Sequence, residues 1–142
     1  MDDSKKKENF LLGIWGVAVV ATAGSLFFSE VMGYEPCELC WYQRILMYPL
    51  VIIYGTALFK RDLSTALPGL FLSGIGMCLS TYHYFIQKLP ALKEAGGACG
   101  LVPCNVEYVN YLGFITIPFM AGSAFILIFV THLVLLKQTR GK

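Results

Sequence analysis

Four of the five cysteines in this 142-residue chain form two closely spaced pairs. Cys37 and Cys40 enclose the motif CELC, and Cys99 and Cys104 enclose CGLVPC. Two neighbouring thiol pairs favour dithiol–disulfide chemistry, in which a thiolate attacks a disulfide and electrons pass from pair to pair. The fifth cysteine, Cys78, stands alone in an apolar stretch. We therefore expect Cys78 to be a buried and unreactive thiol.

The segment PCELCWYQR places the first pair where a helix should begin, because proline favours the first helical position. The free N–H groups and the dipole of a helix start stabilise a thiolate there. Spacings of three and four residues put Cys37, Cys40 and Arg44 on one helical face. Arg44 then holds a thiolate or a carbonyl oxygen, or it extends to the lipid headgroups instead. Gln43 hydrogen-bonds either a ligand or another helix.

Two other interpretations of the cysteines stay open. Four thiolates make a tetrahedral zinc site, although zinc ribbons normally pair two C-x-x-C knuckles and the second pair here is looser. The pairs can also be inert structural disulfides. Such short loops stabilise a fold poorly, because the entropic benefit of a disulfide grows with loop length. A redox role with no metal is therefore the favoured interpretation.

The composition is that of a membrane protein. The chain is 56% hydrophobic and 14% charged, and its mean hydropathy is +0.63. Four apolar runs are each long enough to cross a hydrocarbon core of about 30 Å. They are Phe10–Ser29, Trp41–Phe59, Ala66–Ile86 and Phe114–Leu136. We expect one integral membrane domain over residues 1–142, folded as an antiparallel all-α bundle of four transmembrane helices.

Lysine and arginine set the expected orientation, because cytoplasmic flanks of spans are enriched in both. The basic residues that flank the spans on one side are Lys5, Lys6, Lys7, Lys60, Arg61, Lys137, Arg140 and Lys142, and those on the other are Lys88 and Lys93. Both termini should be cytoplasmic, and loops 30–40 and 87–113 should face outward. The paired cysteines then lie on the oxidising side of a bacterial cell membrane. No basic patch indicates nucleic acid.

The first run also has features of a signal peptide: Lys5–Lys7, an apolar core and Ala21-Thr22-Ala23. Because the run continues to about residue 29, we expect a retained span. This run contains Gly13, Gly16 and Gly24, and small residues let helices approach closely in lipid. We expect the same close approach at Gly74 and Gly76 in the third run.

The motif CELCWYQR, four spans and a second cysteine pair in the second outer loop resemble the DsbB-type disulfide bond formation proteins. The segment HYFIQ, from His83 to Gln87, also resembles that family. The close spacing of Cys99 and Cys104 is similar to that in the small Gram-positive branch of the family, called BdbC. The resemblance covers nearly the whole chain.

The resemblance implies a quinone-dependent protein dithiol oxidase. A reduced extracytoplasmic thioredoxin-like partner of the DsbA or BdbD type would be oxidised by the Cys99–Cys104 disulfide, which the Cys37–Cys40 disulfide would then reoxidise. Cys40 would meet a membrane quinone, with menaquinone favoured over ubiquinone. Arg44, His83 and Gln43 would polarise the quinone oxygens. Such an enzyme supports disulfide formation in exported proteins.

Two alternatives stay open. The chain can be a structural membrane protein whose outer loops are only cross-linked by disulfides, or an enzyme of the vitamin K epoxide reductase type. The second alternative carries its C-x-x-C near the end of a late span, whereas here the motif opens the second span. His132 lies near the cytoplasmic end of the fourth run, and we expect it to pack between helices.

Overall fold

The computed structural model describes residues 3–33, 38–88 and 117–140, all of them helical apart from short turns. The long helices are α1 (Asp3–Leu26), α2 (Glu38–Lys60), α3 (Leu67–Lys88) and α5 (Ile117–Arg140). A π-helix, η1 (Phe27–Val31), continues α1, and a 3-10 helix, η2 (Leu63–Ala66), precedes α3. The all-α prediction is confirmed.

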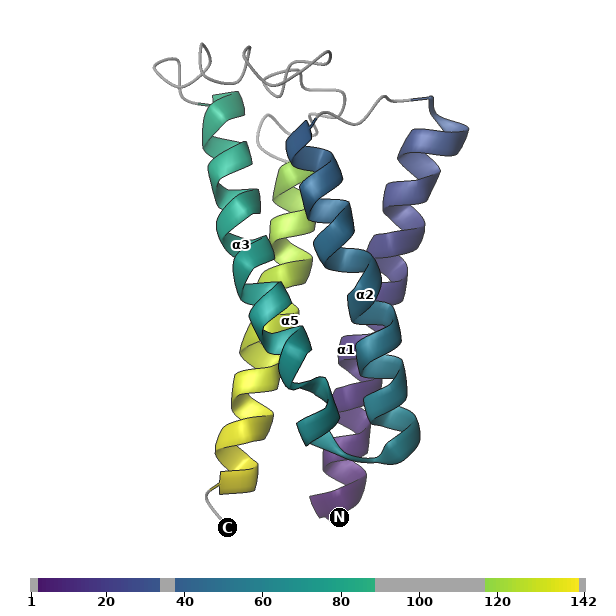
Figure 1. The fold of residues 1–142 in the computed structure, drawn as a ribbon, viewed down its shortest axis with the longest axis vertical. Helices are drawn as coiled ribbons and strands as arrows, with labels where there is room; N and C mark the ends of the chain where they lie inside the picture. The colour runs from purple at the N-terminus through teal and green to yellow at the C-terminus, as the bar shows by residue number, and fades with distance from the viewer. Residues whose placement is uncertain (1–2, 34–37, 89–116, 141–142) are drawn as a thin grey trace.

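The long helices run side by side (Figure 1). The neighbouring pairs are α1 with α2, α2 with α3, α3 with α5, and α5 with α1, whereas α2 and α5 touch little across the diagonal. The start of α1 and the end of α5 lie at the same end of the bundle (Figure 1). We call this the basic end, and the opposite end, where α2 begins, the Cys40 end.

Three segments are long and apolar enough to cross a membrane: Lys5–Val31, Leu63–Ile86 and Phe119–Arg140. Only 17%, 28% and 33% of their most apolar windows is buried inside the protein. Most of this apolar surface therefore faces outward, which suits lipid as the surrounding solvent. Helix α2 is not among these segments, because Gln43, Arg44 and several tyrosines lower its hydropathy. Its membrane crossing stays a prediction.

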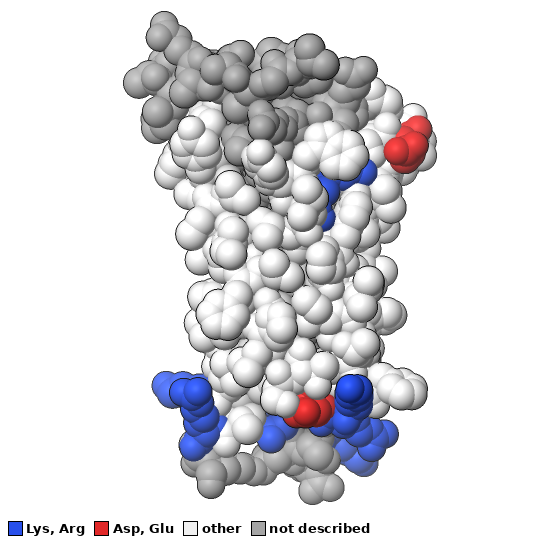
Figure 2. All heavy atoms as spheres, in the orientation of Figure 1, with Lys and Arg blue, Asp and Glu red and all other residues white. Residues whose placement is uncertain are grey.

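Basic side chains gather at one end of the bundle (Figure 2). They belong to the start of α1, the turn after α2 and the end of α5, and those described are Lys5, Lys6, Lys7, Lys60, Arg61, Lys137 and Arg140. The turn is a Schellman motif in which Arg61 takes a positive φ of 56°. Its two backbone bonds run from Arg61 N to Leu58 O (3.3 Å) and from Asp62 N to Ala57 O (3.1 Å).

Asp62 then caps η2. Its carboxylate accepts hydrogen bonds from the Ser64 N–H (3.0 Å) and the Ser64 hydroxyl (2.7 Å). The Ser64 side chain, followed by its backbone, holds the pKa of Asp62 below its usual value. A charged cap therefore turns the chain sharply from α2 into α3 at the basic end, which makes these two helices antiparallel neighbours.

The glycines of α3 pack as expected, whereas those of α1 do not. A Cβ added at Gly76 would lie 2.4 Å from the Phe125 ring of α5, and one at Gly74 would lie 3.2 Å from Phe129. Among the described residues nothing lies within 4 Å of a Cβ built on Gly13, Gly16 or Gly24. The predicted close approach at the α1 glycines is therefore wrong. The buried residues of α1 are the small Ala18 and the larger Leu11 and Ile14.

Gly76→Ala is expected to destabilise the protein by about 1–3 kcal/mol, because the new methyl group meets a fully buried ring. Gly16→Ala is the matched control, since its methyl group enters open space and alanine favours a helix over glycine. Thermal unfolding in detergent measures both variants. Equal melting temperatures for the two would contradict the packing described here.

Candidate functional site

The paired cysteines fall largely beyond what the structure describes. Cys37, Cys99 and Cys104 lie outside the described residues, and Cys40 belongs to the first described turn of α2, without a described side chain. Their pairing and reactivity stay predictions. The groups predicted to accompany them, Gln43, Arg44 and His83, are all described and all buried.

Gln43 of α2 and His83 of α3 form a buried pair. The amide nitrogen Nε2 of Gln43 lies 3.0 Å from His83 Nδ1 and donates to it. A neutral imidazole that accepts at Nδ1 carries its proton on Nε2. The exposed fractions are 4% for Gln43 and 0% for His83, so the bond is made inside the bundle. It joins α2 to α3 near the Cys40 end.

Arg44 lies one residue further along α2 and is bound in a different direction. Its Nη2 donates to the hydroxyl of Ser29 in η1 (3.0 Å), and its Nε donates to the hydroxyl of Tyr48 (2.7 Å). The guanidinium carbon lies 4.9 Å from the centre of the Trp41 ring and 5.5 Å from that of Tyr48. The side chain is 9% exposed, and its hydrogen-bond partners come from η1 and α2. Its extension to the lipid headgroups stays an alternative.

The three predicted quinone-binding residues therefore share one level of the bundle but form two clusters. Successive helical residues point about 100° apart, which sends Gln43 toward α3 and Arg44 toward α1. We call the group of Arg44, Ser29, Tyr48 and Trp41 the arginine cluster. Its donors and those of the Gln43–His83 pair suit ligands with carbonyl oxygens.

Three members of the arginine cluster, Ser29, Tyr48 and Trp41, were not predicted as partners of Arg44. Trp41 precedes Arg44 by three residues and Tyr48 follows it by four, so helical spacing alone could have identified both. Ser29 could not be found in this way, because it lies on another helix. It stands in η1, in which the Met32 N–H bonds to Phe27 O (3.1 Å).

Aromatic side chains surround this level of the bundle. Trp41, Tyr42 and Tyr82 are 51%, 45% and 48% exposed. Such exposed rings are typical of the interface between lipid and water. Tyr84 packs against Phe119, with ring centres 5.9 Å apart.

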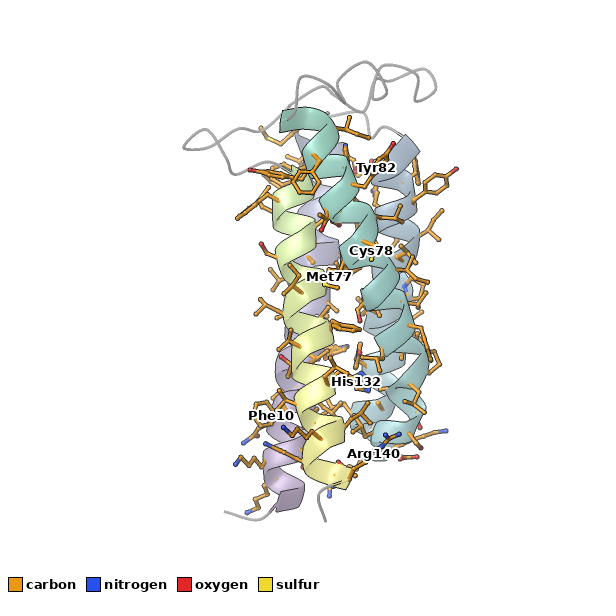
Figure 3. The ribbon with its side chains drawn as sticks, turned by 90° about the vertical axis from the view of Figure 1, so that its left-hand side faces the viewer. Phe10, Met77, Cys78, Tyr82, His132 and Arg140 are labelled. Atoms are coloured by element: carbon orange, nitrogen blue, oxygen red, sulfur yellow. The ribbon has the colours of Figure 1, made fainter. Side chains whose placement is uncertain are left out.

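Cys78 is exposed, and the prediction of a buried thiol is wrong. The buried face of α3 carries Ser73, Gly76, Ser80 and His83, which follow helical spacing. Cys78 is two residues beyond Gly76 and so points away from that face. It lies midway along α3 (Figure 3). An apolar neighbourhood in the sequence did not distinguish the inside of the bundle from its lipid-facing side.

A second buried polar pair lies at the level of His132, away from the Cys40 end (Figure 3). The Tyr54 hydroxyl of α2 and Nδ1 of His132 in α5 are 2.7 Å apart, and both side chains are 0% exposed. This bond crosses the diagonal of the bundle. It agrees with the expected packing role of His132. Gly69 leaves room for the Tyr54 ring, since a Cβ there would lie 2.7 Å from it.

The described residues do not test the interpretation of the paired cysteines as a zinc site. Among residues 3–33, 38–88 and 117–140 no group of three or more histidine, cysteine, aspartate or glutamate side chains is placed to hold a metal ion. The four paired cysteines, which carried the zinc interpretation, have no described side chains. Zinc binding by them stays an alternative.

The fold and the buried clusters define an all-helical protein of membrane type that keeps ionisable side chains inside the bundle. This chain belongs to the DsbB family of disulfide bond formation proteins. The family model "Disulfide bond formation protein DsbB" matches residues 7–135. Membership implies oxidoreductase activity in a membrane.

Similar proteins come from bacilli. A "Probable disulfide formation protein" of Oceanobacillus iheyensis is 67% identical over 140 residues, which cover 98% of this chain and 97% of that protein. The "Disulfide bond formation protein C" of Bacillus subtilis is 48% identical over 138 residues, or 97% and 99% of the two chains. These relatives confirm the resemblance to the small Gram-positive branch. No solved structure matches this chain.

Tyr54→Phe is expected to destabilise the protein by about 0.5–2 kcal/mol, because it removes the bond to a fully buried imidazole. Tyr82→Phe is the control, since this tyrosine is exposed on the outside of α3. Unfolding in detergent, followed by the loss of helical circular dichroism, measures the difference. A Tyr54→Phe protein as stable as Tyr82→Phe would contradict a stabilising role for the pair.

Proposed function

We propose that this protein is a membrane dithiol oxidase that takes two electrons from an extracytoplasmic thioredoxin-like partner and passes them to a quinone. The observation that carries the proposal is the arginine cluster. A guanidinium is held at 9% exposure in the helix that contains Cys40, one turn further into the bundle. A charge inside a membrane protein is costly and usually serves function. Membership of the disulfide bond formation family supports the same conclusion.

The electron path runs through two disulfides. A thiolate of the reduced partner attacks the Cys99–Cys104 disulfide, and the partner leaves as its own disulfide. The released dithiol reduces the Cys37–Cys40 disulfide by the same exchange. Cys37 and Cys40 form their disulfide again as two electrons reach the quinone. The two protons of the partner's dithiol balance the two that the quinone takes up to become quinol.

The quinone is the electron-accepting substrate, and the described residues suit it. A quinone carries two carbonyl oxygens on a flat ring. Arg44 supplies a charged donor, and Gln43 and His83 supply neutral polar groups at the same level. The exposed Trp41 and Tyr42 rings give this level an apolar and aromatic border. We favour menaquinone over ubiquinone because the chain resembles the Gram-positive branch of the family.

The proposed topology has α1, α2, α3 and α5 crossing the bacterial cell membrane, with both termini in the cytoplasm. The gathering of basic side chains at one end supports this orientation (Figure 2). The Cys40 end then faces outward, where disulfides persist. An exported partner of the DsbA or BdbD type would dock there.

Cysteine variants test the path in the purified protein. Cys40→Ser is expected to abolish quinone reduction, because the last disulfide cannot form. Cys99→Ser is expected to abolish oxidation of a thioredoxin-like dithiol. Cys78→Ser is the control and should turn over normally, since this cysteine lies outside both pairs. Normal turnover of both Cys40→Ser and Cys99→Ser would favour the alternative, a membrane protein whose disulfides are only structural.

Arg44→Met tests the quinone contact. The variant keeps an unbranched side chain and removes the charge, and we expect the quinone KM to rise about 10- to 100-fold, the usual effect of losing a charged hydrogen bond. The KM for the reduced partner should stay unchanged. Steady-state kinetics with each substrate varied in turn separates the two. An unchanged quinone KM would remove Arg44 from the quinone site.

A further inference from the structure

The position of the Arg44 guanidinium is fixed from two helices. Its Nη2 is bound to Ser29 of η1, and its Nε is bound to Tyr48 of α2. Two bonds to different atoms of a flat group fix both its place and its tilt. The guanidinium also lies against the Trp41 and Tyr48 rings, which further limit its movement. An arginine held in this way presents its other N–H groups in a set direction.

The Ser29 hydroxyl is itself oriented. It donates to the Leu26 carbonyl (3.3 Å), so its proton is directed into its own helix and a lone pair is left for Arg44. Ser29 lies within η1, and its contact with Arg44 shows that its hydroxyl lies on the side of α2. Eleven residues separate Ser29 from the buried Ala18, and this spacing returns to the same helical face. The contact therefore depends on the residue type and on the face of the helix on which it stands.

We propose that Ser29 is a positioning residue for Arg44, whose hydroxyl fixes the guanidinium from the side of α1. This inference rests on the proposed function, since the group that Arg44 receives is a quinone carbonyl oxygen. Without Ser29 the guanidinium keeps its charge and its bond to Tyr48, but it loses the restraint from α1. A donor that can swing binds a carbonyl less well, because each productive contact then requires ordering of the side chain.

Ser29→Ala tests the inference. We expect the quinone KM to rise roughly tenfold while the KM for the reduced partner stays unchanged. Ser29→Thr keeps a hydroxyl at the same atom and should restore most of the quinone affinity. Ser123→Ala is the matched control, because the Ser123 hydroxyl donates to Phe119 O within its own helix and should leave both constants unchanged.

A double-mutant cycle separates positioning from a general loss of structure. In an Arg44→Met background Ser29→Ala should have no further effect on the quinone KM, because the group that it positions is gone. Additive effects, or a failure of Ser29→Thr to rescue, would overturn the positioning role. If Ser29→Ala does not fold, Tyr48→Phe provides the second arm, since it removes the other anchor and keeps the ring.

The outcomes also distinguish this inference from the proposed function. A raised quinone KM in Arg44→Met with an unchanged one in Ser29→Ala refutes only the role of Ser29. An unchanged quinone KM in both variants refutes Arg44 as a quinone ligand and the inference with it.

Discussion

A charged guanidinium enclosed between two apolar helices is the constraint on which this structure depends. Removing such a charge from water is expensive, and the cost is tolerated only where hydrogen bonds and aromatic faces replace the lost hydration. Ser29, Tyr48 and Trp41 provide that replacement, and they come from both α1 and α2. Arg44 therefore links η1 to α2.

The same principle governs the rest of the interior. Two pairs of buried polar side chains join different helices: Gln43 with His83 between α2 and α3, and Tyr54 with His132 between α2 and α5. Apolar packing fills the space around them, with Leu50, Phe125 and Ile128 fully buried. Because lipid and the helix surfaces are equally apolar, these bonds and the close fit at Gly76 do much to fix which helices are neighbours.

Several features could be predicted from sequence because each depends on local pattern. The apolar runs predicted an all-α protein, and the CELCWYQR motif directed attention to Arg44 and Gln43. What failed depended on which way each helix faces. Cys78 faces outward and the α1 glycines meet open space, and neither could be predicted, because an apolar run does not show which side of a membrane helix faces the other helices. Ser29 was missed because its partner Arg44 lies on another helix.

We propose that the quinone binds at the arginine cluster and not beside the buried Tyr54–His132 pair. A photoreactive quinone analogue, followed by mass spectrometry of the labelled peptides, tests this most directly. We expect cross-links to the end of α1 and the start of α2, around Ser29 and Tyr48, and competition by unlabelled quinone. Specific labelling confined to the peptides that carry Tyr54 and His132 would contradict it.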